Sequence, residues 1–305
     1  MNSFAPIIVF AFNRIDCLKN TISSILNNKE ARQSDLFVFV DGPRTHKKDE
    51  NKEVEAVQEY VKSIDGFKSC TYTFSEHNNG LAKSIINGVS SVIKQYGKAI
   101  ILEDDLALTP NCLSYFNQAL EHYQNDKNVF SICGYTNTVK RPNHYAENTY
   151  FCTRSSSWGW ATWADRWNSV DWKLENWEQV KTTGKAFNKW GGSDCWHMLN
   201  KWHEGKISSW AIRFCYAQFI QNKVSLFPTK SLIGNDGFDG NGTNCKKWSR
   251  FQFELDNSNN KDFSWPETTD INPVLYKEAM KYHSIWIRIY SRIMYAIYDI
   301  KNKIS

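Results

Sequence analysis

The chain has 305 residues, of which 37 are Lys or Arg and 32 are Asp or Glu, and its formal net charge is +5. This length allows one large α/β domain or two smaller ones, and either buries enough apolar surface to fold without disulfide or metal staples. The small charge excess argues against a nucleic-acid partner, although a small anionic ligand or an acidic lipid surface fits it.

Four segments in the first 102 residues predict strands, and the first two are continuous apolar runs typical of buried parallel strands. The four segments are residues 6–12, 36–40, 70–74 and 99–102. A segment predicted as a helix follows each of the first three, with helical apolar spacing in the first and third segments and a charged, exposed pattern in the second. These segments are residues 16–26, with Asp16 as the expected N-cap, 47–62 and 81–93. The alternation predicts a mostly parallel, Rossmann-like sheet whose ligand lies beyond the carboxyl ends of the strands.

The second half of the chain follows the pattern less closely. Residues 112–123 predict a helix and residues 129–133 a strand, but beyond Gly134 the alternation weakens and tryptophans multiply. We therefore expect a soft boundary near Tyr150. No internal repeat or low-complexity segment is present.

Three consecutive carboxylates, Glu103, Asp104 and Asp105, follow the fourth predicted strand. In a buried cleft they would repel one another, at a cost that a cation or hydrogen-bond donors would have to offset. Strand alternation would place Glu103 and Asp105 on one face and Asp104 on the other. Oxygen ligands favour Mn²⁺ or Mg²⁺ over Zn²⁺. The alternative is that the triplet caps the next helix or solvates a loop.

This region resembles a known family. Residues 101–106, followed by Pro110 and Tyr115-Phe116, resemble the metal-binding region of GT-A type glycosyltransferases, and the closest resemblance is to the N-acetylglucosaminyltransferase I family and its bacterial relatives. Residues 12–14, 40–42 and 77–84 resemble the nucleotide-binding positions of GT-A enzymes in order and spacing. The resemblance covers roughly the first half of the chain, and the agreement of several weak motifs strengthens each of them.

The resemblance implies an α/β fold of the GT-A type, with a mostly parallel sheet flanked by helices, an aromatic-rich acceptor half and a C-terminal amphipathic helix. Residues 1–150 would bind the nucleotide-sugar donor. Residues 151–265 would form the acceptor-binding half of the same catalytic domain, and residues 266–305 a helical tail.

The resemblance also implies roles for individual residues. Asp105 would ligate Mn²⁺ or Mg²⁺ directly, Asp104 would contact the ribose, and Asp41 would accept a hydrogen bond from the base. The full set of implied donor-binding residues is Phe12, Arg14, Asp41, Asn78, Lys83, Glu103, Asp104, Trp158, Gly159 and Trp160. On local pattern alone, Asp41 also fits a plain turn, and Lys83 also fits a solvated helix face.

Residues 155–163, with the sequence SSSWGWATW, are the most unusual stretch of the chain. Glycine between two tryptophans permits a close backbone approach, and indole rings pack against the apolar faces of sugars. The stretch resembles the segment that forms the donor-sugar and acceptor edge in related transferases. We therefore place Trp158 and Trp160 at the site, and we expect Trp163 and Trp167 in the core.

An inverting transfer needs a base near the acceptor hydroxyl. Asp194 lies where the family places its catalytic carboxylate, although the family has adjacent acidic residues there and this chain has Ser193 before Asp194. Asp165, Asp236 and Asp239 remain alternatives. Residues 233–244 are rich in turn formers and could form either a lid over the donor or a surface turn.

The resemblance therefore predicts a metal-dependent inverting glycosyltransferase. It would move a sugar from a nucleoside-diphosphate sugar to a hydroxyl of a glycan or lipid-linked acceptor, in surface polysaccharide biosynthesis. The alternatives are a nucleotidyltransferase acting on sugar phosphates, which normally has a glycine-rich loop that residues 12–16 lack, and a non-catalytic carbohydrate-binding protein.

Three features of the sequence give expectations about where in the cell the protein lies. The eight cysteines form no C-x-x-C pair or ligand-spaced cluster, so we expect reduced core residues in a cytoplasmic protein. The first apolar run lacks a basic leader and is too short to span a bilayer, so we expect no secretion signal. An apolar stripe with basic neighbours from Trp286 onward favours peripheral contact with an anionic membrane at the inner face of the plasma membrane, or packing on the catalytic domain.

Overall fold

The computed structural model describes residues 4–47, 50–235 and 253–304, with side chains up to residue 294. Its central feature is a sheet of eight strands with the order β3-β2-β1-β4-β8-β6-β9-β7. The strands are β1 (Ile7–Ala11), β2 (Asp35–Val40), β3 (Ser69–Phe74), β4 (Lys98–Glu103), β6 (Val129–Cys133), β7 (Thr149–Cys152), β8 (Trp160–Trp163) and β9 (Val224–Pro228). A separate pair joins β5 (Leu106–Leu108) to β10 (Ile233–Asn235).

The sheet is mostly parallel. Its first four strands in spatial order, β3, β2, β1 and β4, run parallel, and so do β6 and β9. Strands β8 and β7 are antiparallel to their neighbours. The predicted α/β class with a mostly parallel sheet is therefore confirmed, and the carboxyl ends of β1, β2, β3 and β4 meet at one edge.

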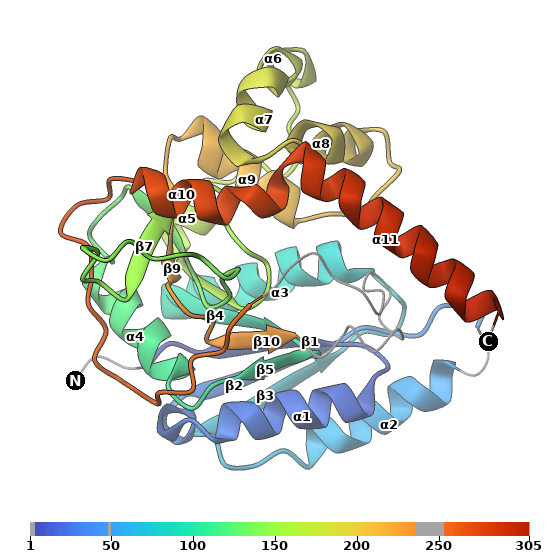
Figure 1. Cartoon of the computed structure of the whole chain (residues 1–305). Coiled ribbons are helices and arrows are strands. Elements are labelled where there is room, and N and C mark those ends of the chain that lie inside the picture. Colours follow the sequence, from blue (N-terminus) through green and yellow to red (C-terminus); the bar gives the residue numbers. More distant parts are fainter. Residues whose placement is uncertain (1–3, 48–49, 236–252, 305) are drawn as a thin grey trace.

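Helices cover both faces of this sheet (Figure 1). Alternate residues of β1 point to opposite faces, so Ile7 and Val9 belong to one core cluster while Ile8 and Phe10 belong to another. The first cluster includes α1 (Ile15–Leu26), α2 (Glu50–Lys62) and α4 (Cys112–His122), and the second includes α3 (Leu81–Tyr96), α5 (Ala164–Asn168) and α9 (Ala211–Ile220).

Two further groups of helices complete the described chain. Helices α6 (Trp177–Thr182), α7 (Gly184–Gly191) and α8 (Cys195–His203) pack with α9 around a third apolar cluster. Helix α10 (Pro273–Met280) packs on β7 and β9, and a short 3₁₀ turn, η3 (Lys281–His283), leads into α11 (Ile285–Ile304). Another 3₁₀ turn, η1 (Lys29–Gln33), precedes β2. No helix in the described ranges combines the length and apolarity that a bilayer span requires.

The expected elements of the first half agree with this structure, with one local error. All four predicted strands are present, and so are the helices that follow them. Asp16 is not the N-cap of α1, because that helix begins at Ile15 and Arg14 is its N-cap. Strands on both sides of residue 150 share one sheet, so the division into a donor half and an acceptor half stays a prediction about function.

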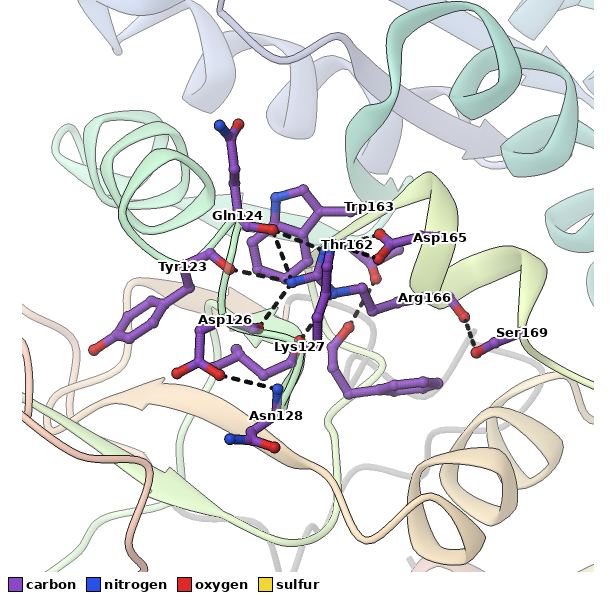
Figure 2. A network of polar contacts seen from close by, with 12 residues as sticks. Tyr123, Gln124, Asp126, Lys127, Asn128, Thr162, Trp163, Asp165, Arg166 and Ser169 are labelled. Atoms are coloured by element: carbon purple, nitrogen blue, oxygen red, sulfur yellow. Dashed lines mark hydrogen bonds and ion pairs between the residues drawn. The ribbon is translucent and has the colours of Figure 1, made fainter.

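Arg166, in the second half of the chain, forms hydrogen bonds with main-chain groups of the first half (Figure 2). Its guanidinium is almost fully buried, and it donates hydrogen bonds to main-chain carbonyls of residues 123, 124, 126 and 129. It also lies 4.2 Å from the centre of the Trp163 ring. Asp165 pairs with this arginine and with Lys127 in the same network. Asp165, one alternative for the catalytic base, therefore has a structural role.

Candidate functional site

The acidic triplet lies where β4 ends beside β1. The main-chain N–H of Phe12, just past β1, donates to Asp104 Oδ2 at 3.3 Å. Arg14 Nη2 contacts Asp104 Oδ1 at 2.5 Å and Asp105 Oδ2 at 3.0 Å. The Thr21 hydroxyl, on α1, donates to the main-chain carbonyl of Asp104. The loop after β1 and the first helix thus fix the position of the acidic turn.

The expected alternation of the three carboxylates is wrong. It assumed that the strand continues through Asp105, but β4 ends at Glu103, and residues 104 and 105 form a turn. A turn releases the side chains from the two-residue period of a strand. As a result, Asp104 and Asp105 both reach the same guanidinium nitrogen.

Burial sets the protonation of this cluster. Loss of solvent raises the pKa of Glu103 to about 8, and the charges of Asp105 and Asp104 add to that rise. Burial also raises the pKa of Asp104, to about 6, although Arg14 opposes the shift. Burial alone would lower the pKa of Arg14, but the neighbouring carboxylates outweigh it and raise the pKa. The guanidinium thus offsets part of the negative charge.

Asp41 organises the second part of the site. Its carboxylate accepts hydrogen bonds from the main-chain N–H groups of Gly42, Asn79 and Gly80. The Asn78 amide donates to the carbonyl of Gly42 at 2.9 Å. A Cβ on Gly42 would lie 2.6 Å from backbone atoms of Ser75 and His77, so only glycine permits this approach. Asp41 is therefore a turn-former as well as a cleft residue.

These loops surround a cleft with a volume of about 470 Å³ at the carboxyl ends of the strands. It brings together eight of the predicted site residues. They are Phe12, Arg14, Asp41, Asn78, Glu103, Asp104, Asp105 and Trp158. Residues more than a hundred positions apart in the sequence therefore share one hollow, as the strand-end argument predicts.

Trp158 and Trp160 have different environments. Trp158 lines the cleft and packs edge-on against Tyr135, with 4.5 Å between ring centres. Trp160 is only 1% exposed, because β8 turns it into the core, where it stacks on Trp167 and Trp210. The placement of Trp160 at the site is therefore corrected to a core position. The expected core positions of Trp163 and Trp167 are confirmed.

Gly159 shapes the cleft without lining it. Its φ is +63°, and a Cβ there would lie 1.9 Å from the Ile233 side chain of β10. The close approach expected at this glycine is therefore present, and the group that approaches it is the protein's own Ile233 side chain. Gly159 sets the position of Trp158 against β10.

Lys83 does not line the cleft. It is exposed on α3, while its neighbours Ala82 and Ser84 face the hollow. Because α3 begins at Leu81, side chains at successive positions point around the helix. The alternative interpretation of Lys83, a solvated helix face, is the one that the structure supports.

Asp194 lies outside the cleft, at the N-terminus of α8. Its carboxylate is buried and pairs with Arg154 at 2.7 Å. Met198, one turn later on α8, lines the cleft. Arg154 lines a second hollow that shares Ser157 and Trp158 with the cleft. Arg154 thus places the pair beside the second hollow, and α8 leads from Asp194 to Met198 in the cleft. Asp236, Asp239 and most of the candidate lid fall outside the described residues.

Several cleft residues have no counterpart among the predicted ones. They are Arg44, Met198, Ser208, Ser209 and Trp210. Arg44 lies 5.3 Å from the Phe12 ring centre and pairs with Glu50. It follows the Asp41 turn directly, so its position at a strand end could have predicted it as a cleft residue. The others come from the second half, where the sequence offers no strand-end pattern.

The acidic turn suits a divalent cation only in part. Within the described ranges, no group of three His, Cys, Asp or Glu side chains is arranged to hold a metal ion. One Asp105 oxygen faces Arg14, and the other has no hydrogen bond or ion pair among the described residues. Mg²⁺-type sites often use one or two carboxylates and complete their shell with water and substrate phosphate oxygens. Asp105 together with a diphosphate fits that description.

Comparison with known proteins agrees with the sequence resemblance. A family model described as the GNT-I family matches residues 1–181. The curated proteins contain no match to the chain. Among solved structures, the chain is similar to a mannosyltransferase, PcManGT from Pyrobaculum calidifontis, in complex with GDP-Man and Mn²⁺. That match has 13% identity and a TM-score of 0.36, and it covers 53% of this chain and 45% of that chain.

Proposed function

The chain belongs to the GNT-I family, and from this membership we propose that it is a GT-A type glycosyltransferase. It transfers a sugar, with inversion, from a nucleoside-diphosphate sugar to a hydroxyl of a glycan or lipid-linked acceptor. The observation that supports this proposal best is the cleft that gathers Arg14, Asp41, Asp105 and Trp158 at the carboxyl edge of the sheet. Sheets of this kind bind nucleotides at such an edge.

The donor would lie along the cleft, with its nucleoside near Asp41 and its diphosphate near Asp105. The carboxylate of Asp41 already accepts three main-chain N–H groups, which leaves a lone pair of its two oxygens for a base or ribose donor. Arg14 and Arg44 supply positive charge beside the diphosphate. Trp158 offers an indole face to the transferred sugar.

A divalent cation, Mn²⁺ or Mg²⁺, would be held by Asp105 and, when bound, would stabilise the charge of the diphosphate leaving group. Arg14 would then release Asp105 and turn towards the phosphates, since one guanidinium nitrogen holds both carboxylates in the free protein. Its other nitrogen, Nη1, is buried without a hydrogen-bond partner among the described residues. A phosphate oxygen would satisfy that donor.

The acceptor would enter the second hollow, which meets the cleft at Ser157 and Trp158. Asp194 remains the proposed base for the acceptor hydroxyl. Its carboxylate pairs with Arg154 at 2.7 Å, and a carboxylate of this kind can act as a general base. The attack on the anomeric carbon would then take place next to Trp158, where the two hollows join.

The cellular setting is part of the proposal. A cytoplasmic enzyme of this kind, resting on the inner face of the plasma membrane, would meet the lipid-linked acceptors of surface polysaccharide biosynthesis. The basic residues near the C-terminus suit an anionic surface.

Release of the nucleoside diphosphate tests the proposed function. The protein is incubated with a panel of nucleotide sugars and Mn²⁺, with and without glycan acceptors, and nucleoside diphosphate and sugar product are measured. A transferase releases the diphosphate and forms a glycoside of inverted configuration. Pyrophosphate release from nucleoside triphosphates would instead identify a nucleotidyltransferase. Carbohydrate binding that ignores nucleotide and Mn²⁺ would identify a binding protein.

A further inference from the structure

Helix α11 has one face fixed to the body of the protein. The Arg288 guanidinium donates to the Ser193 hydroxyl at 3.1 Å, and Ser291 is only 4% exposed. Just before the helix, the carbonyl of His283 accepts hydrogen bonds from the N–H and hydroxyl of Ser193. The start of α11 is therefore attached to the turn that precedes Asp194, and packing on the catalytic domain accounts for this face.

The other face of α11 carries large apolar side chains in solvent. Ten large hydrophobic residues are exposed in the described chain, and five of them lie on nine consecutive residues of this helix. These five are Ile285, Trp286, Ile289, Tyr290 and Ile293, between 43% and 77% exposed. Their spacing of three and four residues places them along one stripe. A contiguous exposed stripe of this kind marks an interaction surface.

The charge around this stripe has a single sign. Between Glu278 and Asp299 the sequence contains no acidic residue, whereas Arg288 and Arg292 are basic. Arg288 lies on the fixed face, and Lys281, which precedes the helix, pairs with Glu278. Arg292 is exposed and lies beside the apolar stripe on the helix surface. The face therefore combines isoleucine, tryptophan and tyrosine with positive charge.

We propose that this face of α11 docks on an anionic phospholipid surface. Isoleucine side chains would enter the acyl boundary, and Trp286 and Tyr290 would lie at the headgroup level that such rings prefer. Basic residues near an anionic bilayer add electrostatic attraction. A second copy of the chain fits less well, because pairing two such faces would bring the basic residues of both copies together without acidic partners.

Docking of this face would also bring the second hollow close to the membrane. Ala279, Met280 and His283, from α10 and η3, line that hollow and lead directly into α11. A lipid-linked acceptor could then enter from the surface on which the helix rests. This last step depends on the proposed transfer reaction, whereas the docking itself does not.

Vesicle flotation of the full chain tests the docking. The protein is floated with neutral phosphatidylcholine vesicles and with vesicles that also contain phosphatidylglycerol. We expect binding to the anionic vesicles that weakens with added salt. The double variant Trp286→Glu/Ile293→Glu should bind at least about tenfold more weakly, equivalent to about 1.4 kcal/mol. Ile220→Glu on α9 is the matched control, because Ile220 is 55% exposed and lies outside α11.

Three outcomes would overturn the proposal. They are no binding to either kind of vesicle, equal losses in the α11 variant and the Ile220→Glu control, and a dimer in light scattering that the double variant converts to a monomer. The last would assign the face to a second copy of the chain. Thermal stabilisation by nucleoside diphosphates with Mn²⁺ is measured on the same samples. If no sample were stabilised by nucleoside diphosphate and Mn²⁺, the result would count against the proposed function. If the samples were stabilised but did not bind vesicles, only the docking proposal would fail.

Discussion

Arg14 lies between the two aspartates of the acidic turn, with one guanidinium nitrogen 3.0 Å from Asp105 and in contact with Asp104 as well. The guanidinium therefore supplies the positive charge that this turn requires in the free protein. A divalent cation at Asp105 would have to compete with it. The relationship makes the affinity of the free protein for metal depend on a residue that is not itself a ligand.

Arg14→Gln should increase the affinity for Mn²⁺ in the absence of nucleotide. Removing the guanidinium leaves the buried carboxylates without their counter-charge, so a cation gains attraction, on the order of tenfold in the dissociation constant or about 1.4 kcal/mol. Calorimetry of Mn²⁺ binding to the nucleotide-free protein measures this change in the dissociation constant. Arg14→Lys keeps the charge and serves as the control. Equal Mn²⁺ affinity in wild type and Arg14→Gln would show that the arginine does not compete.

Asp105→Ala should abolish metal-dependent turnover and leave the fold intact. One oxygen of the Asp105 carboxylate is not engaged by the described residues, and the other pairs with Arg14 at the edge of the cleft. We expect kcat/KM to fall by at least about 100-fold, the range seen when a group that stabilises developing charge is lost. The release of nucleoside diphosphate measures turnover, and thermal denaturation checks the fold. Unchanged turnover would remove Asp105 from the metal site.

Asp194→Asn should lower kcat while donor binding stays the same. Asparagine keeps the shape of the side chain and a hydrogen-bond acceptor for Arg154 but cannot take a proton from the acceptor. A lost general base typically reduces the rate by about 10²–10⁴-fold. Single-turnover rates and the dissociation constant of the nucleoside diphosphate separate the two effects. An unchanged rate would assign the base to another group and leave the donor site as proposed.

Much of the first half could be predicted from the sequence because two local signals coincide there. Apolar runs mark the strands β1, β2 and β4, and polar residues mark their carboxyl ends, so Arg14, Asp41 and the acidic triplet could be placed at one edge before their contacts were known. Backbone connectivity in a parallel sheet then brings them together. The contact between Arg14 and Asp105 itself depends on β4 ending at Glu103, which the period of a strand does not reveal.

The second half could not be predicted as well, because its packing is not periodic. Trp158 and Trp160 are equally aromatic and flank the same glycine, yet Trp158 precedes β8 and lines the cleft, whereas Trp160 begins β8 and lies in the core. Strand β8 lies between β4 and β6 in reverse direction, an insertion that no local pattern signals. Met280 and His283 reach the second hollow through tertiary contacts alone.

Glu103→Gln should stabilise the metal-free protein at alkaline pH. Burial, together with the charges of Asp105 and Asp104, raises the pKa of Glu103 from 4.5 to about 8, so the folded protein binds this proton more tightly than the unfolded chain does. Wild-type stability therefore falls as the pH rises from about 4.5 through about 8, and the glutamine variant avoids that loss.

We expect the advantage of Glu103→Gln to reach the order of 5 kcal/mol above pH 8 and to vanish below pH 4.5. Urea unfolding at several pH values, in the presence of a chelator, measures the difference. An advantage that is independent of pH would mean that packing, and not the ionisation of Glu103, limits stability.

Gly159→Ala should lower the free energy of unfolding, because the added methyl group would clash with the Ile233 side chain of β10. A matched control separates this steric effect from the backbone effect. The added methyl group would lie 1.9 Å from Ile233 Cδ1, and the φ of +63° is unfavourable for alanine as well. Gly97→Ala is the matched control, because Gly97 has a φ of +75° with no atom within 4 Å of an added Cβ. The control should therefore lose only the backbone contribution, about 1 kcal/mol of unfolding free energy.

The Gly159→Ala variant should lose about 1–3 kcal/mol more than this control, the usual cost of overpacking a core. Ile233→Ala in the same chain removes the side chain that the methyl group meets, so the double variant should recover part of that extra loss relative to the sum of the single changes. Urea unfolding of the four variants measures the coupling. Strictly additive losses would show that Gly159 is required only for its backbone conformation, and that Ile233 does not determine where Trp158 lies.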